Sequence, residues 1–387
     1  MTRKPFHIKR WLVAVAAGWC MLLGAQPFDT ENFVVSLLTA DPGDELYATF
    51  GHSAIRVRNT ASEYDAVFNY GLFNFDAPNF YGNFARGRMN YCLGVQQFER
   101  FVGAYAYEDR EIREQILLLD ANQKDFIIRF LLNNAKPENK YYRYHFFLDN
   151  CATRIRDLMQ QTFPNVIWSP AAENPSYRDL VYDCTRNQPW GRFGIDVALG
   201  LPTDQKTDAW EQMFLPDYLS ASLAKATCNG KPIAGEIHPV FVPDNPLVVQ
   251  PSRITPMMVC CALLALALFF CFLPKGARVF DFTLFLIAGL VGVLVVFLWF
   301  FTDHTNTHGN LNIFWALPTH LVMAFFLLSR RQKVFVKYYF LITAVVALLL
   351  LVSWVFLPQH LNIALIPVVI ALALRAFVNS RVSYRSR

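Results

Sequence analysis

The chain has 387 residues, of which 54% are hydrophobic and only 17% are charged, and the apolar excess lies almost entirely after residue 255. This distribution excludes an ordinary soluble globular protein and indicates a membrane-embedded C-terminal part. The net charge of +5 comes from basic residues that are dispersed or stand beside apolar runs. It therefore reflects membrane topology and argues against a nucleic-acid partner.

The N-terminus predicts an exported protein. Basic residues precede an apolar run at 11–24, and small residues end it at Ala25. This is the pattern of a signal peptide over residues 1–25, with an uncleaved signal anchor as the alternative. Residues 26–254 have the mixed composition of a globular domain and are long enough to bury a core of their own.

The first segment with candidate chemistry is residues 50–57, FGHSAIRV. Its alternation after the glycine predicts a strand that begins at His52, and a turn at 59–62 predicts a second, paired strand over 64–70. We expect the His52 ring to lie against the sheet. Asn69 and Tyr70, on the second strand, are the candidates for the group that orients this ring.

The second segment is residues 142–159, in which a run of aromatics ends at two good N-caps, Asp149 and Asn150. Cys151 is then in the first turn of a helix, where free N–H groups and the helix dipole favour a thiolate and can hold an oxyanion. With His52 as general base, Cys151 is a candidate nucleophile. The alternative is a structural cysteine and an ordinary strand histidine.

The membrane part is predicted from hydropathy and charge. Residues 233–253 are rich in proline and predict an extended connector. Five apolar runs then approach the ~20 residues that span a bilayer, and they predict an all-α bundle over 255–380. The runs are 256–273, 280–301, 314–328, 338–357 and 363–378. Lys and Arg alternate between the loops, which places residues 26–254 outside and the basic tail 381–387 in the cytoplasm.

A polar loop at 302–312 lies between the second and third predicted spans, on the same side as Cys151. A solvated interfacial loop is its ordinary interpretation. The alternatives are a metal shared by two histidines four residues apart, and a role in covering the active site or holding a lipid headgroup. The polar residues of the loop include Asp303, His304, His308, Asn310 and Asn312.

Other residues of the exported domain allow weaker predictions. Arg154 follows Cys151 on its helix face, so it either holds a phosphate or carbonyl near the site or is simply solvated. Residues 73–84 carry aromatics among Asn, Pro and Gly and predict a loop. Its rings either enter the membrane interface or cover a lipid groove, or they anchor the core. Cys184 and Cys228 are our guess for a disulfide, because Cys151 is needed elsewhere.

A histidine strand that precedes an Asn-Cys helix start resembles the circularly permuted papain-like fold, of which the NlpC/P60-type amidases are members. This resemblance implies an α+β exported domain. More specifically, short segments are similar to the family whose exported part is the Lnb N-terminal periplasmic domain, and the likeness extends into the membrane part. These segments are GHS at 51–53, NYGLF at 69–73, DNCATR at 149–154, GID at 194–196, MFLP at 213–216, TDH at 302–304 and NLN at 310–312.

The resemblance implies a cysteine-dependent acyltransferase of the bacterial inner membrane that N-acylates the amino-terminal cysteine of diacylated lipoproteins. Cys151 forms the acyl thioester and His52 is the base, and the acyl donor is a phospholipid or a diacylglyceryl group. No metal or other cofactor is expected. The alternatives are a membrane-anchored periplasmic hydrolase or amidase and a non-catalytic envelope assembly factor. The residues assigned to substrate binding are Asn150, Arg154, His304, Asn310 and Asn312.

Overall fold

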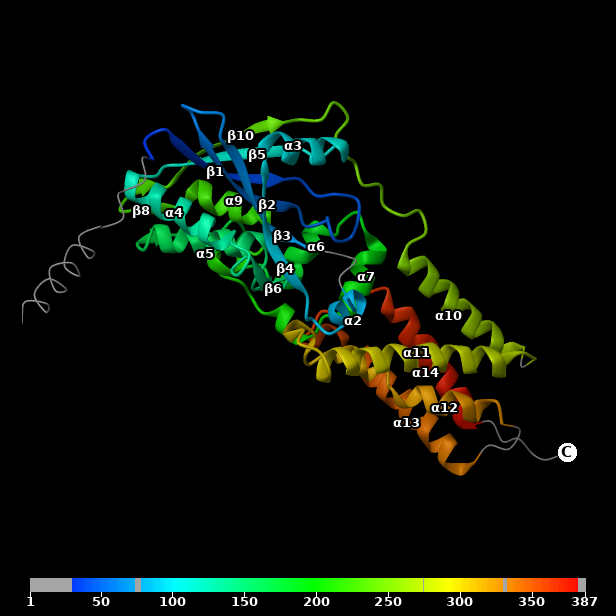
Figure 1. The fold of residues 1–387 in the computed structure, drawn as a ribbon. Helices are drawn as coiled ribbons and strands as arrows, with labels where there is room; N and C mark the ends of the chain where they lie inside the picture. The colour runs from blue at the N-terminus through cyan, green and yellow to red at the C-terminus, as the bar shows by residue number, and fades with distance from the viewer. Residues whose placement is uncertain (1–29, 74–77, 274, 330–332, 382–387) are drawn as a thin grey trace, which may run out of the picture.

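The computed structural model describes residues 30–73, 78–273, 275–329 and 333–381, so the predicted signal peptide and the basic tail lie outside the described residues. An α+β domain comes first, and a set of long helices extends away from it (Figure 1). This arrangement agrees with the division into an exported domain and a C-terminal helical part.

The α+β domain is built on a seven-stranded antiparallel sheet with the strand order β10-β5-β1-β2-β3-β4-β6. Its strands are β1 (Phe33–Ala40), β2 (His52–Asn59), β3 (Asp65–Leu72), β4 (Asn90–Gln97), β5 (Ile112–Leu117), β6 (Tyr141–Arg143) and β10 (Ala234–Phe241). A small second sheet contains β7 (Val166–Ile167), β8 (Thr227–Cys228) and β9 (Lys231–Pro232).

Different helices cover the two faces of the large sheet, because successive side chains of a strand point to opposite faces. Ala54 of β2 packs with Phe101 of α3 (Phe98–Tyr107) on one face. Ile55, its neighbour, belongs to the larger core on the other face. The helices of that core are α4 (Ala121–Asn134), α5 (Cys151–Thr162) and α9 (Pro216–Lys225). The predicted nucleophile therefore begins a helix that is packed directly on the sheet.

Two helices, α6 (Tyr177–Cys184) and α7 (Pro189–Ala198), belong to a smaller lobe with its own apolar cluster, which includes Phe147, Leu180 and Phe214. This lobe lies between the sheet and the membrane helices (Figure 1). The 3-10 helix η1 (Leu201–Asp204) and the short helix α8 (Ala209–Gln212) follow in the chain, and Trp210 of α8 packs against the main core.

The predicted hairpin and the helix start are confirmed. β2 and β3 pair in antiparallel fashion, and the Asn59 N–H closes the turn on the Tyr64 carbonyl at 2.8 Å. α5 begins at Cys151. One face of this helix is apolar, because Ile155 and Leu158 are fully buried in the main core.

Two predictions about loops are wrong in part. The first half of the proline-rich connector is the edge strand β10, and only the residues after Phe241 are irregular. An edge strand tolerates Pro239 because its missing N–H is not needed for an inner ladder.

The aromatic stretch 73–84 contains a short helix, α2 (Phe80–Ala85), of which Phe80 is buried and Tyr81 is exposed. Phe75 lies outside the described residues.

Five helices follow the connector, but only three segments of the described part are long and apolar enough to cross a membrane. These are Ala277–Phe300, Thr305–Leu327 and Val334–Phe356. The first and last helices have 17 residues each, so the five-span count rests on the sequence pattern. The helices are α10 (Pro256–Phe272), α11 (Ala277–Phe300), α12 (Thr319–Leu327), α13 (Val334–Ser353) and α14 (Leu365–Arg381), with short 3-10 helices η2 (Thr305–Thr307), η3 (Leu311–Phe314) and η4 (Trp354–Phe356).

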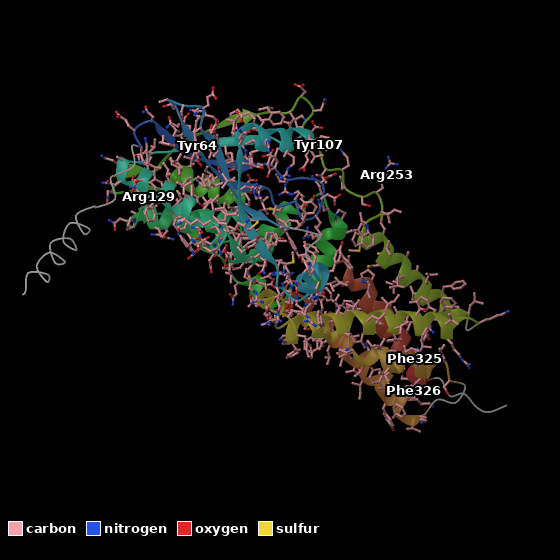
Figure 2. All side chains as sticks on the ribbon, in the orientation of Figure 1. Tyr64, Tyr107, Arg129, Arg253, Phe325 and Phe326 are labelled. Atoms are coloured by element: carbon pink, nitrogen blue, oxygen red, sulfur yellow. The ribbon has the colours of Figure 1, made fainter. Side chains whose placement is uncertain are left out.

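A buried ion pair joins α11 and α14 in the helical part. The Arg375 guanidinium of α14 bonds both carboxylate oxygens of Asp281 on α11, at 2.6 and 2.9 Å, and Asn379 also bonds Asp281. A paired charge of this kind is tolerated away from water because each ion satisfies the other. At the end of the bundle remote from the sheet, Phe325 and Phe326 of α12 are seen (Figure 2).

Candidate active site

Cys151 is held at the start of α5 by its neighbour, Asn150. The Asn150 Oδ1 accepts hydrogen bonds from the N–H groups of Ala152 and Thr153, both at 2.9 Å. Its side-chain NH₂ donates to two backbone carbonyls, one of which is that of Phe214 at 2.9 Å. Since every polar group of this buried amide is occupied, the structure places Asn150 as the residue that fixes the helix start. The bond to Phe214 also gives segment 213–216 a structural role.

We expect Asn150→Ala to lower the free energy of unfolding by about 2–4 kcal/mol, because it removes an N-cap and leaves two carbonyls without their donor. Asp120→Ala is the matched control, since Asp120 caps α4 with a similar capping box on an exposed surface. Its cost should be about 1 kcal/mol. Denaturant unfolding of the detergent-solubilised chain measures both. Equal costs would contradict the role of the carbonyl contacts.

His52 lies at the start of β2, with its ring between a thiol and an amide. Its Nε2 donates to the Asn69 Oδ1 at 2.6 Å. This bond leaves Nδ1 as the nitrogen that can accept the proton of Cys151, which lies beside the ring. The three side chains therefore form a relay of the kind that a thiol nucleophile needs.

Gly71 provides the space in which the ring and the thiol meet. A Cβ at this position would lie 3.5 Å from the His52 Cε1 and 3.7 Å from the Cys151 Cβ. Its φ of +97° favours glycine, and the pairing of β3 with β4 shifts register between Asn69 and Leu72. Such bulges commonly re-aim side chains beside active sites.

The electrostatics favour a thiolate and an imidazolium. Burial alone would raise the pKa of Cys151, but the charge and hydrogen bond of His52, together with the N–H groups of Ser53 and Ala152, lower it. Burial would likewise lower the pKa of His52, yet the Cys151 charge and the hydrogen bonds to Cys151 and Asn69 raise it, against a smaller opposing effect of Arg110. Each group thus stabilises the charged form of the other.

Three tyrosines that the sequence did not single out surround this pair. Tyr105 of α3 is stacked near His52, with 6.5 Å between ring centres. Tyr91 and Tyr144 are stacked on each other at 4.1 Å. Burial, and then the charge of Cys151, raise the pKa of Tyr91 to about 12 and also raise the pKa of Tyr144, so both rings lie near the thiol. Aromatic rings therefore line the site.

The other two predicted residues on these elements lie elsewhere. Tyr70 is on the opposite face of β3 from Asn69, where it packs against Tyr142 at 6.2 Å, so it does not orient the imidazole. Arg154 makes two bonds to the Asp149 carboxylate, at 2.6 and 2.8 Å, and lies 4.0 Å from the centre of the Tyr142 ring. It stabilises the turn that leads into α5.

The polar loop is bound to the α+β domain although Asp303 and Thr305 stay exposed, so its interpretation as a solvated loop is wrong in part. Asp303 forms ion pairs with Arg143 and, at 3.1 Å, with Arg88. The His304 Nε2 lies 3.1 Å from the backbone oxygen of Phe84 in α2. The loop therefore docks beside the short aromatic helix.

The same loop also reaches the segment that leads to the cysteine. The Thr305 Oγ1 lies 3.1 Å from the Nε2 of His145, and His145 forms a backbone bridge with Asp149. His304 and His308 flank a three-residue 3-10 helix, so the α-helix on which they were to share a metal is not formed. The described residues contain no group of three or more His, Cys, Asp or Glu placed to hold a metal ion.

Asn310 and Asn312, which were assigned to substrate, are fully buried where the two halves of the chain meet. The Asn310 amide donates to the Val197 carbonyl at 2.8 Å, and the Asn312 amide donates to the Asp196 carbonyl at 3.0 Å. Both acceptors belong to α7. The structure thus places these asparagines as bonds between the helical part and the α+β domain.

Asp196 is the centre of this domain joint, which we define as Arg178, Asp196, Asn310, Asn312 and Asn362. Its carboxylate is fully buried and bonds the Arg178 guanidinium, the Tyr182 hydroxyl and the Asn362 amide, each at 2.8 Å. Asn362 comes from the turn between α13 and α14. The GID segment at 194–196 therefore joins the two halves of the chain.

The guess of a disulfide between Cys184 and Cys228 is wrong, because both thiols are free. Cys184 of α6 packs into the smaller lobe, whereas Cys228 of β8 packs against the main core. The two cysteines therefore belong to separate clusters, and spacing alone did not reveal this.

The fold and the site together define a membrane protein whose exported α+β domain carries a cysteine–histidine–asparagine site. Comparison with family models gives two matches, the Lnb N-terminal periplasmic domain over residues 25–181 and the Lnb transmembrane domain over residues 249–387. Only residues 1–24 and 182–248 lie outside these matches. The chain belongs to the Lnb family, and its N-terminal domain is periplasmic. No curated protein and no solved structure matched the chain.

Proposed function

We propose that this protein is a thiol acyltransferase that N-acylates the amino-terminal cysteine of diacylated lipoproteins. The observation that carries the proposal is the relay of Cys151, His52 and Asn69, in which the thiolate is stabilised although it is half-buried. Membership of the Lnb family supports a role in lipoprotein acylation. The domain joint keeps this site next to the membrane, where both substrates reside.

In the first half-reaction the Cys151 thiolate attacks an ester carbonyl of the donor lipid. The N–H group of Ser53, which helps to lower the pKa of Cys151, is the candidate donor to the oxyanion. The acyl C–O bond breaks and the leaving alcohol takes a proton from the His52 imidazolium. The product is an acyl thioester on Cys151.

In the second half-reaction the α-amine of the lipoprotein attacks the thioester. His52 accepts the amine proton, the C–S bond breaks, and the thiolate is restored as the amide forms. Tyr91, Tyr105 and Tyr144 limit water at the thioester, which favours transfer over hydrolysis. Asn69 holds the imidazole in one orientation through both steps.

The proposal includes the finer topology. We take residues 1–25 as the signal peptide, 26–254 as a permuted papain-like periplasmic domain, 255–380 as five spans and 381–387 as a cytoplasmic tail. The alternation of basic loops supports the five spans and the orientation. The order of a histidine strand before a cysteine helix supports the permuted arrangement.

We expect Cys151→Ala to abolish N-acylation, because the thioester cannot form. Mass spectrometry of the N-terminal peptide of a model lipoprotein, made in cells without their own N-acylation, measures this. Cys184→Ala is the control, since it removes a free thiol in the other cluster. A third acyl chain with wild type and Cys184→Ala, but not with Cys151→Ala, supports the proposal. A lipoprotein that stays diacylated with wild type would favour a hydrolase, which would release free acid.

A further inference from the structure

A groove of about 440 Å³ lies where the periplasmic domain meets the outer end of α11. Its upper rim is cationic and comes from the loop after α2, whereas its lower wall is apolar and comes from α11 and the residue before α12. The groove residues are Arg86, Arg88, Val293, Val296, Phe297, Phe301 and Pro318. The groove therefore has the amphipathic character of a lipid at the membrane surface.

The rim is held in place by the polar loop. Gly87 approaches His304 so closely that a Cβ would lie 3.1 Å from the imidazole Nδ1, and its φ of +69° also favours glycine. The Asp303 N–H bonds the Arg86 carbonyl at 2.9 Å. Exposed aromatic rings of α2, among them Tyr81, stand beside this rim, as rings do at membrane interfaces. α2 lies between the sheet and the membrane helices (Figure 1).

The rim has an excess of positive charge. Among the described residues, Asp303 is the one carboxylate that pairs with Arg88 and Arg143. Arg86 is exposed and has no ion-pair partner in the described part of the chain. Two guanidinium groups thus share one carboxylate while that of Arg86 stays unpaired, and such a rim is complementary to a phosphate, which arginine binds through two parallel hydrogen bonds.

Aromatic contacts connect this rim to the thiol. Phe80 of α2 is stacked on Phe73 at 6.1 Å, and Phe73 lies 5.0 Å from Tyr91. Tyr91 is stacked on Tyr144, and both rings are close enough to Cys151 to respond to its charge. These rings thus form a packed aromatic row between the helix that precedes the rim and the nucleophile.

We propose that this groove binds a glycerophospholipid, with its phosphate on Arg86 and Arg88 and one acyl chain along the wall formed by Val293, Val296 and Phe297. The inference rests on the proposed function, for which this lipid is the acyl donor. Cys151 bonds to the ester carbonyl, the acyl C–O bond breaks, and the glycerol oxygen leaves with the proton of His52 as a lysophospholipid. The diacylglyceryl group of a lipoprotein has no phosphate, so the arginines distinguish the donor from the acceptor.

The test measures lipid binding by the full-length Cys151→Ala chain in detergent, which does not depend on catalysis. The probes are phosphatidylglycerol and diacylglycerol with the same fluorescent acyl chain, together with inorganic phosphate. Arg86→Gln is expected to weaken phosphatidylglycerol binding by about tenfold or more, whereas Arg86→Lys retains most of it. Arg58→Gln, at the far end of β2, is the matched control and should bind like the parent. Val293→Trp should block binding by filling the groove while the arginines stay intact.

Equal phosphatidylglycerol affinity of the parent and Arg86→Gln would overturn the proposal. The proposal would also be overturned if diacylglycerol or inorganic phosphate bound as tightly as phosphatidylglycerol. The donor role is then measured on the chain that retains Cys151. Release of lysophosphatidylglycerol supports that role. Binding without release refutes the donor role, and the groove would then still be a lipid-binding site.

Discussion

His52→Ala is expected to remove the reactivity of Cys151 at low pH and to lower acyl transfer by about two to four orders of magnitude. In the wild type, His52 and two N–H groups keep the pKa of Cys151 below its ordinary value against the effect of burial. Alkylation of Cys151 should therefore persist at pH values below those at which an ordinary thiol is deprotonated and reacts. In His52→Ala the burial remains but the imidazolium is absent, so the pKa rises and alkylation should require higher pH.

Peptide mass spectrometry across pH measures the rate of alkylation at each cysteine, so Cys184 serves as an internal reference for Cys151. Burial, and then the charges of Asp217 and Asp183, raise the pKa of Cys184 to about 12, so this thiol should react slowly throughout. His238→Ala is the control variant, because His238 is exposed on the edge strand β10. It should leave the Cys151 profile unchanged. If His52→Ala and His238→Ala gave the same profile, the thiolate would not depend on His52.

The sequence predicted those parts of the site that depend on local signals. The alternation after Gly51 and the N-cap at Asn150 are each contained within a few residues, so the positions of His52 and Cys151 follow from their own neighbours. The choice between Asn69 and Tyr70 was left open. It depends on the register between β2 and β3, which places Ile55 opposite Phe68 and so sends Asn69 to the His52 side.

The aromatic walls and the domain joint could not be predicted in this way. Tyr91, Tyr105 and Tyr144 lie on β4, on α3 and after β6, and only the folded sheet brings them to the thiol. Asp196 and Asn362 are separated by 166 residues, and no local pattern relates them. The contacts of the polar loop could not be predicted for the same reason, since an isolated polar segment between two spans does not reveal the surface that it contacts.

Asp196→Ala is expected to have the largest effect on stability and to lower the free energy of unfolding by about 3–5 kcal/mol. It removes one of the two carboxylates that pair with the buried Arg178 guanidinium, and it also removes the contact to Asn362. Asn362 belongs to the membrane part, so the two halves should also separate more readily. Faster proteolysis of the exposed connector that follows Phe241 would report this separation.

Asp183→Ala is the matched control, since Asp183 forms an exposed pair with Arg186 that should contribute less than about 1 kcal/mol. Thermal unfolding in detergent measures the stability of both variants, and acyl transfer by each is measured at matched abundance. If the joint keeps the active site next to the membrane, Asp196→Ala should lose transfer to lipoproteins while Cys151 retains its alkylation profile. Loss of that profile as well would mean that Asp196 supports the fold of the periplasmic domain rather than its position over the lipid.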